Sequence, residues 1–230
     1  MLHNNKFLAG FVAAIAVTLS ASPAHATTWV DANCSGASSP NDGVGGSAMS
    51  SWTRANAQSY AYVGNKEGYQ WGGGCNNDDD RDNSPGQPTE QTSTKGEGTD
   101  CSGLVYKSWA LPHTNVDGYT SWARMNYEHG TPNSTAYKNG TWGSSTAAAY
   151  YKLPNKSRST TAKMDAFAKN GHIGLLYTND GTSNGLDYIM ESYNEKDGTD
   201  LNVRNYRTNS DYSGVRRDQW QTDGYCHMCA

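Results

Sequence analysis

Hydrophobic residues recur at helical spacing in the first half of the chain. One such stretch covers residues 48–64 and predicts a helix. Its apolar positions are Trp52, Ala55, Tyr60 and Val63. A second helix is predicted from Asp100 to just before Pro112, because proline does not continue a helix. Further helical patches are predicted near residues 120–128 and 144–151.

The last third of the chain alternates apolar and polar residues as β-strands do. Short runs at 172–178, 186–193 and 201–207 are separated by turn signals such as Asn-Asp-Gly and Lys-Asp-Gly. In the second run the alternation puts one set of side chains on one face and the next set on the other. The two sets are Tyr188, Met190, Ser192 and Ile189, Glu191, Tyr193. Helices followed by a small antiparallel sheet indicate an α+β fold.

A polar segment separates the two predicted helices. Residues 75–99 contain no apolar residue except Cys75, so we expect a long surface loop there. Asp78, Asp80 and Asp82 are spaced like the first ligands of a calcium loop. The glycine and the glutamate that such a loop requires are absent, so we expect a solvated acidic loop and no metal.

The N-terminus has the pattern of an export signal. Lys6 precedes an apolar run over residues 7–19, and an Ala-His-Ala string ends at Ala26. The run is too short to span a bilayer. We therefore expect residues 1–26 to be a signal peptide, cleaved after Ala26, and the mature protein to be secreted. Residues 27–47 are rich in Gly, Ser, Asn and Pro and predict an extended segment.

Composition and charge exclude several classes of protein. With Lys+Arg 18 and Asp+Glu 22, the net charge of -4 gives no electrostatic reason to bind nucleic acid or an anionic membrane. The 7 Trp and 15 Tyr supply enough burial for an ordered domain. We expect a monomer whose core holds most of the central aromatic residues, which are Trp122, Tyr127, Tyr137, Trp142, Tyr150 and Tyr151.

All 5 cysteines follow the signal peptide, and an odd number cannot all pair. Four of them are candidates for disulfides, in any of three combinations: Cys34, Cys75, Cys226 and Cys229. The last two belong to a C-terminal tail over residues 218–230. A zinc site there would lack a second pair of ligands, so we expect no metal and no cofactor. Cys101 is the odd one out by its context.

Cys101 lies at the predicted start of a helix, with Asp100 as the expected N-cap. The helix dipole and the unpaired N–H groups there favour a thiolate, and the same N–H groups suit an oxyanion. Of the histidines after the signal peptide, only His172 lies in a strand-like run, where a base would be held rigidly. Glu191 is the expected partner for the far imidazole nitrogen. The alternative is that Cys101 is half of a disulfide or an inert buried thiol, and that His172 is a surface residue.

Three strings, in this order, make the chain similar to the NlpC-type cell-wall peptidases. They are Tyr69-Gln70-Trp71-Gly72-Gly73, Asp100-Cys101-Ser102-Gly103-Leu104-Val105 and His172-Ile173-Gly174-Leu175-Leu176. Members of that family are papain-like cysteine endopeptidases of α+β fold that cut peptidoglycan stem peptides. The resemblance covers about residues 48–217, which we take as the catalytic domain.

The resemblance implies roles for particular residues. Cys101 matches the family's nucleophile and His172 its base, while Tyr69, Asp100 and Ser102 would border the substrate cleft. Glu191 matches the third catalytic position, where the family usually has His, Asn or Gln. Met164, which precedes Asp165, occupies a position that is usually glycine. The segment 75–99 is longer than its counterpart in the family and is expected at the rim of the cleft.

These observations predict a secreted cysteine endopeptidase or amidase that hydrolyses amide bonds in peptidoglycan stem peptides. One alternative is a secreted acyl or amide transferase, such as a toxin, in which an amine takes the place of water. The other is a wall-binding module with a disabled site. Loss of the thiol or the imidazole would mark such a module, and the chain keeps both Cys101 and His172.

Overall fold

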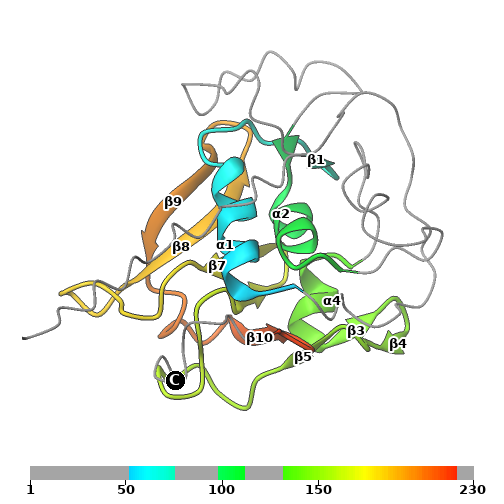
Figure 1. Ribbon diagram of the computed structural model, residues 1–230, viewed down its shortest axis with the longest axis vertical. Coiled ribbons are helices and arrows are strands. Elements are labelled where there is room, and N and C mark those ends of the chain that lie inside the picture. The colour runs from blue at the N-terminus through cyan, green and yellow to red at the C-terminus, as the bar shows by residue number, and fades with distance from the viewer. Residues whose placement is uncertain (1–51, 76–97, 112–131, 222–230) are drawn as a thin grey trace, which may run out of the picture.

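The computed structural model describes residues 52–75, 98–111 and 132–221. Within them, helices pack on a six-stranded antiparallel sheet, which confirms the α+β class (Figure 1). The strand order is β5-β10-β6-β7-β8-β9. These strands are β5 (Tyr150–Lys152), β6 (Ala166–Lys169), β7 (His172–Leu176), β8 (Asp187–Asn194), β9 (Gly198–Arg204) and β10 (Ser213–Arg217).

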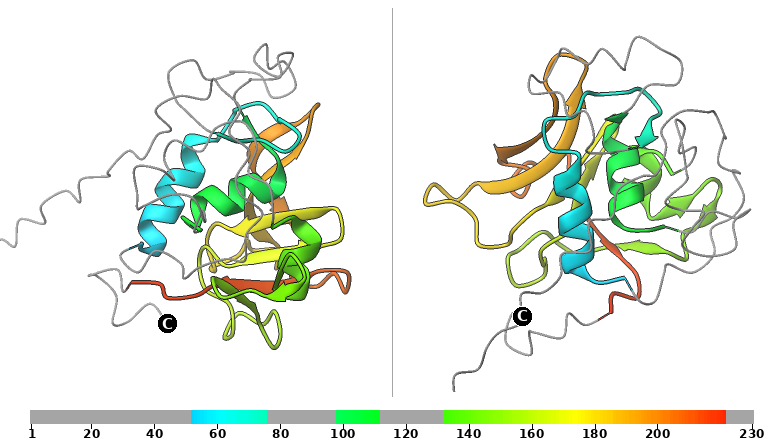
Figure 2. Two further views of the ribbon diagram at one scale, coloured as in Figure 1. Left: turned by 90° about the vertical axis from the view of Figure 1, so that its right-hand side faces the viewer. Right: turned by 45° about the horizontal axis from the view of Figure 1, so that its top comes forward.

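The helices begin at polar capping residues. Helix α1 (Arg54–Val63) is capped by Thr53, and α2 (Cys101–Ser108) by Asp100. A short third helix, α4 (Ser134–Asn139), starts at Asn133. Figures 1 and 2 show α1 and α2 side by side, with α2 against β7 and β8 and α4 against β6 and β10.

The sequence predicted several of these elements. The strands β7, β8 and β9 match the three predicted runs, although β9 begins three residues early, at Gly198. The helix predicted over 144–151 is wrong. That region holds β4 (Ser145–Thr146), paired with β3 (Thr141–Trp142), and the start of β5. Gly143, between β3 and β4, has a φ of 59°, which suits a turn between strands rather than a helix. The helical patch predicted near 120–128 lies outside the described residues.

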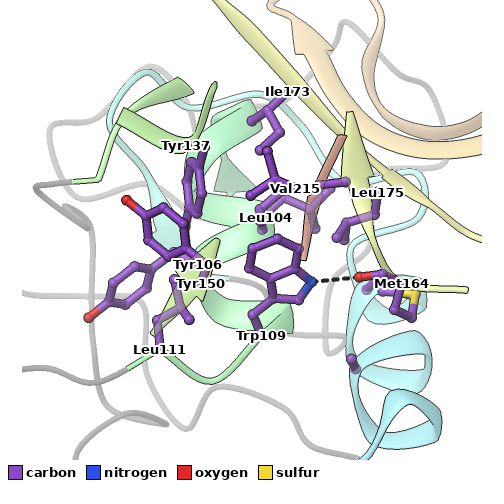
Figure 3. Close-up of a cluster of buried hydrophobic side chains, with 14 of the residues drawn as sticks. Leu104, Tyr106, Trp109, Leu111, Tyr137, Tyr150, Met164, Ile173, Leu175 and Val215 are labelled. Atoms are coloured by element: carbon purple, nitrogen blue, oxygen red, sulfur yellow. Dashed lines mark hydrogen bonds between the residues drawn. The ribbon is translucent and has the colours of Figure 1, made fainter. Parts of the chain in front are cut away.

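The main core lies between the helices and one face of the sheet (Figure 3). Trp109 follows α2, and its indole Nε1 donates to the backbone oxygen of Met164 at 2.8 Å. Tyr137 and Tyr150 pack with ring centroids 4.7 Å apart. Together with Trp142 they confirm the expected aromatic core. Tyr151 is instead 43% exposed, while Trp122 and Tyr127 lie outside the described residues.

The opposite face of the sheet carries a smaller apolar cluster. It consists of Phe167, Leu176, Ile189, Tyr206 and Tyr212. Ile189 thus faces away from Met190, which belongs to the helix-side core. The alternation predicted for this strand is therefore confirmed.

The packed body continues past residue 217, where the sequence suggested the catalytic domain ends. Gln221 forms a parallel bridge with Thr53 and donates its backbone N–H to Trp52 at 3.1 Å. The ring of Trp220 lies 4.8 Å from the guanidinium carbons of both Arg54 and Arg217. The predicted signal peptide, the 27–47 segment and the cysteines of the tail lie outside the described residues. Within the described ranges, no helix has the length and apolar character needed to cross a membrane.

Candidate active site

Asp100 joins two of the strings singled out in the sequence. Its carboxylate caps α2 by accepting from the Gly103 N–H at 2.7 Å and from the Ser102 hydroxyl at 2.9 Å. The other carboxylate oxygen accepts from the Gly72 N–H at 3.1 Å. The turn that holds Tyr69 is therefore tied directly to the N-terminus of α2.

Backbone pairing strengthens this junction. The strands β1 (Gly74–Cys75) and β2 (Gly98–Thr99) pair across it, and the Asp100 N–H donates to Gly73 at 3.1 Å. A Cβ added to Gly73 would meet the Gly98 oxygen at 2.4 Å, so only glycine allows this approach. The glycine string therefore allows the backbone of this turn to approach β2 closely.

Cys101 is free and buried at the first position of α2, with 9% of its surface exposed. Burial, followed by the negative charge of Asp100, raises the pKa of the Cys101 thiol to about 12. Hydrogen bonds from the backbone N–H groups of Ile173, Ser102 and Cys101 itself act in the opposite direction. The expectation of a resting thiolate is therefore wrong: the group is a protonated thiol at neutral pH.

Tyr69 lies close enough to this thiol for the two groups to interact electrostatically. Burial raises the pKa of the Tyr69 hydroxyl, and the charge of Asp100, together with that of Cys101 once it ionises at high pH, raises it further. Asp100 and Ser102 are buried, as Tyr69 is. The side-chain oxygens of Asp100 and Ser102 take part in the helix cap.

His172 is the first residue of β7, and Glu191 lies on the adjacent strand β8. The imidazole Nε2 lies 2.8 Å from Oε2 of Glu191, so the hydrogen bond expected between them is present. A Cβ on Gly174, in β7, would lie 2.5 Å from the side chain of Ile189 and 3.5 Å from Oε2 of Glu191. The glycine of the His-Ile-Gly string therefore leaves room mainly for the side chain of Ile189 on β8.

Glu191 is fully buried yet remains a carboxylate. Burial raises its pKa, but hydrogen bonds from His172 and Tyr206 and the charges of His172 and Arg204 outweigh burial and hold the pKa below its ordinary value. An ionised carboxylate only accepts hydrogen bonds. His172 therefore donates from Nε2, which leaves Nδ1 with a lone pair whenever the ring is neutral.

The structure brings Cys101 next to the strand that carries His172. The thiol lies beside the backbone of Ile173, which directly follows His172 in β7. Among the hydrogen bonds of the described residues, none joins the Cys101 sulfur to the His172 ring. The imidazole is thus paired with Glu191, and the thiol contacts the backbone of Ile173, the residue that follows His172.

Met164 has a left-handed backbone. Its φ of 62° is a conformation that glycine adopts readily and that other residues adopt only with strain. The next residue, Asp165, is buried and pairs with Arg54 at 3.0 Å and Arg216 at 2.7 Å. The strained position is therefore held in place by ion pairs to α1 and β10.

Arg204, Tyr206 and Tyr193 also surround the His172–Glu191 pair, and the sequence reasoning missed them. Arg204 and Tyr206 hydrogen-bond to Glu191, and the ring of Tyr193 lies 5.2 Å from that of His172. Strand pairing alone does not reveal these contacts, because β9 pairs Arg204 with Asp187 and Asp200 with Glu191, and Tyr206 follows the end of β9.

No described group of three or more His, Cys, Asp or Glu residues is arranged to hold a metal ion. Comparison with known proteins finds no match to this chain among protein-family models, curated proteins or solved structures.

Proposed function

We propose that this protein is a cysteine peptidase of papain-like, NlpC-type fold that hydrolyses amide bonds in peptidoglycan stem peptides. The observation that carries the proposal is the placement of the free Cys101 at the capped N-terminus of α2, beside the strand whose first residue, His172, is hydrogen-bonded to Glu191. The substrate class rests on the resemblance of the three sequence strings.

The chemistry begins from a neutral thiol. Because the pKa of Cys101 is raised to about 12, a base must remove the proton as the sulfur attacks the amide carbon. Nδ1 of His172 is the nitrogen left free for this task by the hydrogen bond from Nε2 to Glu191. Catalytic hydrogen bonds often form only when substrate is bound, and substrate binding is the step that brings the sulfur and Nδ1 together.

The remaining steps follow from the same groups. Backbone N–H groups at the start of α2 stabilise the negative oxygen of the tetrahedral intermediate. The His172 imidazolium then gives its proton to the leaving amine, and water attacks the thioester to release the second product. In this scheme Tyr69 forms the wall beside the thiol, while Asp100 and Ser102 fix the helix terminus.

The test uses purified peptidoglycan and the mature protein. Mass spectrometry of the released muropeptides is expected to show new pairs of amine and carboxyl ends with the parent protein and none with Cys101→Ala. Products joined to an added amine in place of water would identify a transferase. Equal binding to cell walls by both proteins, with no new ends from either, would support a wall-binding module and refute the proposal.

A further inference from the structure

Three donors converge on the buried carboxylate of Glu191. Oε1 accepts from Nε of Arg204 at 2.5 Å, and Oε2 accepts from the hydroxyl of Tyr206 at 2.6 Å and from His172 at 2.8 Å. These donors come from β9, from the segment after β9, and from β7. Two of the three have no direct contact with a reacting atom in the proposed mechanism, so their role lies in what they do to Glu191.

An isolated carboxylate in this position would take up a proton. Complete burial disfavours the charged form, and a charge with no partner is costly in the interior of a protein. A protonated Glu191 would no longer be the acceptor that fixes Nε2–H. Arg204 supplies the opposite charge, and Tyr206 supplies a neutral hydrogen bond.

The donors are themselves held by aromatic rings. The guanidinium carbon of Arg204 lies 5.0 Å from the ring centre of Tyr193, which meets the His172 ring edge-on. The ring of Tyr206 is stacked on that of Tyr212, with ring centroids 4.0 Å apart. It also meets the His172 ring edge-on, with ring centroids 5.9 Å apart. The imidazole is therefore bordered on two sides, and Tyr193, at 43% exposure, marks the side that faces solvent.

We propose that Arg204 and Tyr206 are positioning residues for the His172 ring. They keep Glu191 ionised, so that it accepts the hydrogen bond from the ring, and the charge of Arg204 offsets the effect of the carboxylate charge on the ring. The proposal rests on the proposed function, because orientation of the ring matters only if the ring acts as a base. A carboxylate beside an imidazole stabilises the protonated ring, which cannot accept a proton from a thiol. The guanidinium on the same carboxylate opposes that effect. Glu191 can then orient the ring while the ring stays available as a base.

The test is an NMR titration of the mature protein with ¹⁵N-labelled histidine rings, in which the His172 signals are assigned by their loss in His172→Gln. Besides Glu191 and the two positioning residues, the described titratable or charged groups near the ring are Cys101, Tyr193, Tyr212 and Lys169. The ring of the parent protein is expected to carry its proton on Nε2 when neutral.

For each variant we expect a change of stated direction in the pH midpoint of the His172 titration. Arg204→Gln removes the balancing charge and is expected to move the His172 titration midpoint up by about one pH unit. Tyr206→Phe keeps the stacked ring, removes only the hydroxyl, and moves the midpoint up by about half as much. Glu191→Gln moves it down. Arg204→Lys restores most of the parent value, because it restores the charge.

Lys169→Gln is the matched control. Lys169 is the register partner of His172 on β6, but its ammonium group lies over Tyr212, 5.3 Å from the ring centre. Its removal is expected to give less than half of the Arg204→Gln shift. A midpoint that stays or falls in both Arg204→Gln and Tyr206→Phe, or a parent ring protonated on Nδ1, would overturn the proposal.

The titration needs no substrate, so the two proposals can fail separately. The expected shifts in a protein that leaves peptidoglycan uncut would refute only the proposed function. Cleavage of peptidoglycan without the shifts would refute only the positioning role. Where cleavage occurs, Arg204→Gln is also expected to move the acidic limb of the rate profile to higher pH, a change that simple loosening of the fold would not produce.

Discussion

Burial, rather than the helix terminus, sets the resting state of the Cys101 thiol. A helix dipole contributes about 0.3–1 kcal/mol at an exposed site, while one pKa unit corresponds to about 1.4 kcal/mol. The dipole alone therefore lowers a thiol pKa by less than one unit. Desolvation and the charge of Asp100 outweigh it and raise the pKa to about 12. The sequence revealed the helix terminus but not the burial, so it predicted the wrong protonation state.

The charge of Asp100 can be separated from its capping role. Asn is as good an N-cap as Asp, so Asp100→Asn keeps the cap and removes the charge that raises the Cys101 pKa, although its NH2 group can no longer accept from the Gly72 N–H. We expect alkylation of Cys101 by iodoacetamide at pH 8 to become several-fold faster, as followed by mass spectrometry of the peptide containing Cys101. Asp211→Asn, on the exposed surface, is the control and should leave the rate unchanged. A slower reaction in Asp100→Asn would contradict this account of the pKa.

Met164 gives a second test at the residue scale, because its left-handed backbone reverses an ordinary preference. Glycine normally destabilises a strand or helix relative to alanine, but at a φ of 62° alanine is strained by about 1 kcal/mol or more. Both Met164→Ala and Met164→Gly lose a fully buried side chain and should be destabilised. We expect Met164→Gly to be the more stable of the two in urea unfolding. At Ala168 in β6 the usual order should hold, with Ala168→Gly less stable than the parent.

Among the elements, the sequence predicted best those whose signals are local. The N-cap at Asp100, the start of α2 and the alternation of β8 all depend on neighbouring residues, and all are confirmed. The hydrogen bond between His172 and Glu191 followed from that alternation plus the resemblance. Arg204 and Tyr206 were missed because they reach Glu191 through long side chains, from the end of β9 and from the segment after it, and not as its strand-pairing partners. The region 144–151 was mistaken for a helix because glycine turns and cross-strand pairing override its alanine content.

The turn at residues 69–74 should be sensitive to a single methyl group. In Gly73→Ala the new Cβ would overlap the Gly98 oxygen, so the turn must move away from Asp100. We expect a loss of about 1–3 kcal/mol in urea unfolding. Gly171→Ala is the matched control: its φ of 83° is also left-handed, but its Cβ would meet nothing within 4 Å, so the expected loss is about 1 kcal/mol. Equal losses for the two variants would show that the close approach to β2 is unimportant.

For the whole molecule, the two faces of the sheet have different roles, one in the main core and one in holding Glu191. One face packs against α1, α2 and α4 and forms the main core, while the other carries Glu191 and the ring of Tyr206. The candidate site lies where the N-terminus of α2 meets the first residue of β7. The fold thus places a thiol from the helical layer beside the strand that begins with His172, whose ring is held by Glu191 of the neighbouring strand.

The buried carboxylate also makes stability depend on pH. The pKa of Glu191 is lower in the folded protein than in the unfolded chain, so its stabilising effect is complete above the unfolded value and is lost as the pH falls through the folded value. We expect the free energy of unfolding, measured with urea, to decrease between pH 6 and pH 3. In Glu191→Gln, which cannot titrate, the decrease should be smaller. An identical decrease in both proteins would contradict the assigned ionisation of Glu191.

The most direct measurement of the central claim is the rate at which a defined stem peptide is cleaved by the parent protein, Cys101→Ala and His172→Gln. We predict cleavage by the parent and a loss of about 10³-fold or more in each variant, because nucleophile and base act as a unit. We also predict a transient adduct of acyl-peptide mass on Cys101 in acid-quenched parent samples. Cleavage by Cys101→Ala at a rate close to that of the parent would contradict the account.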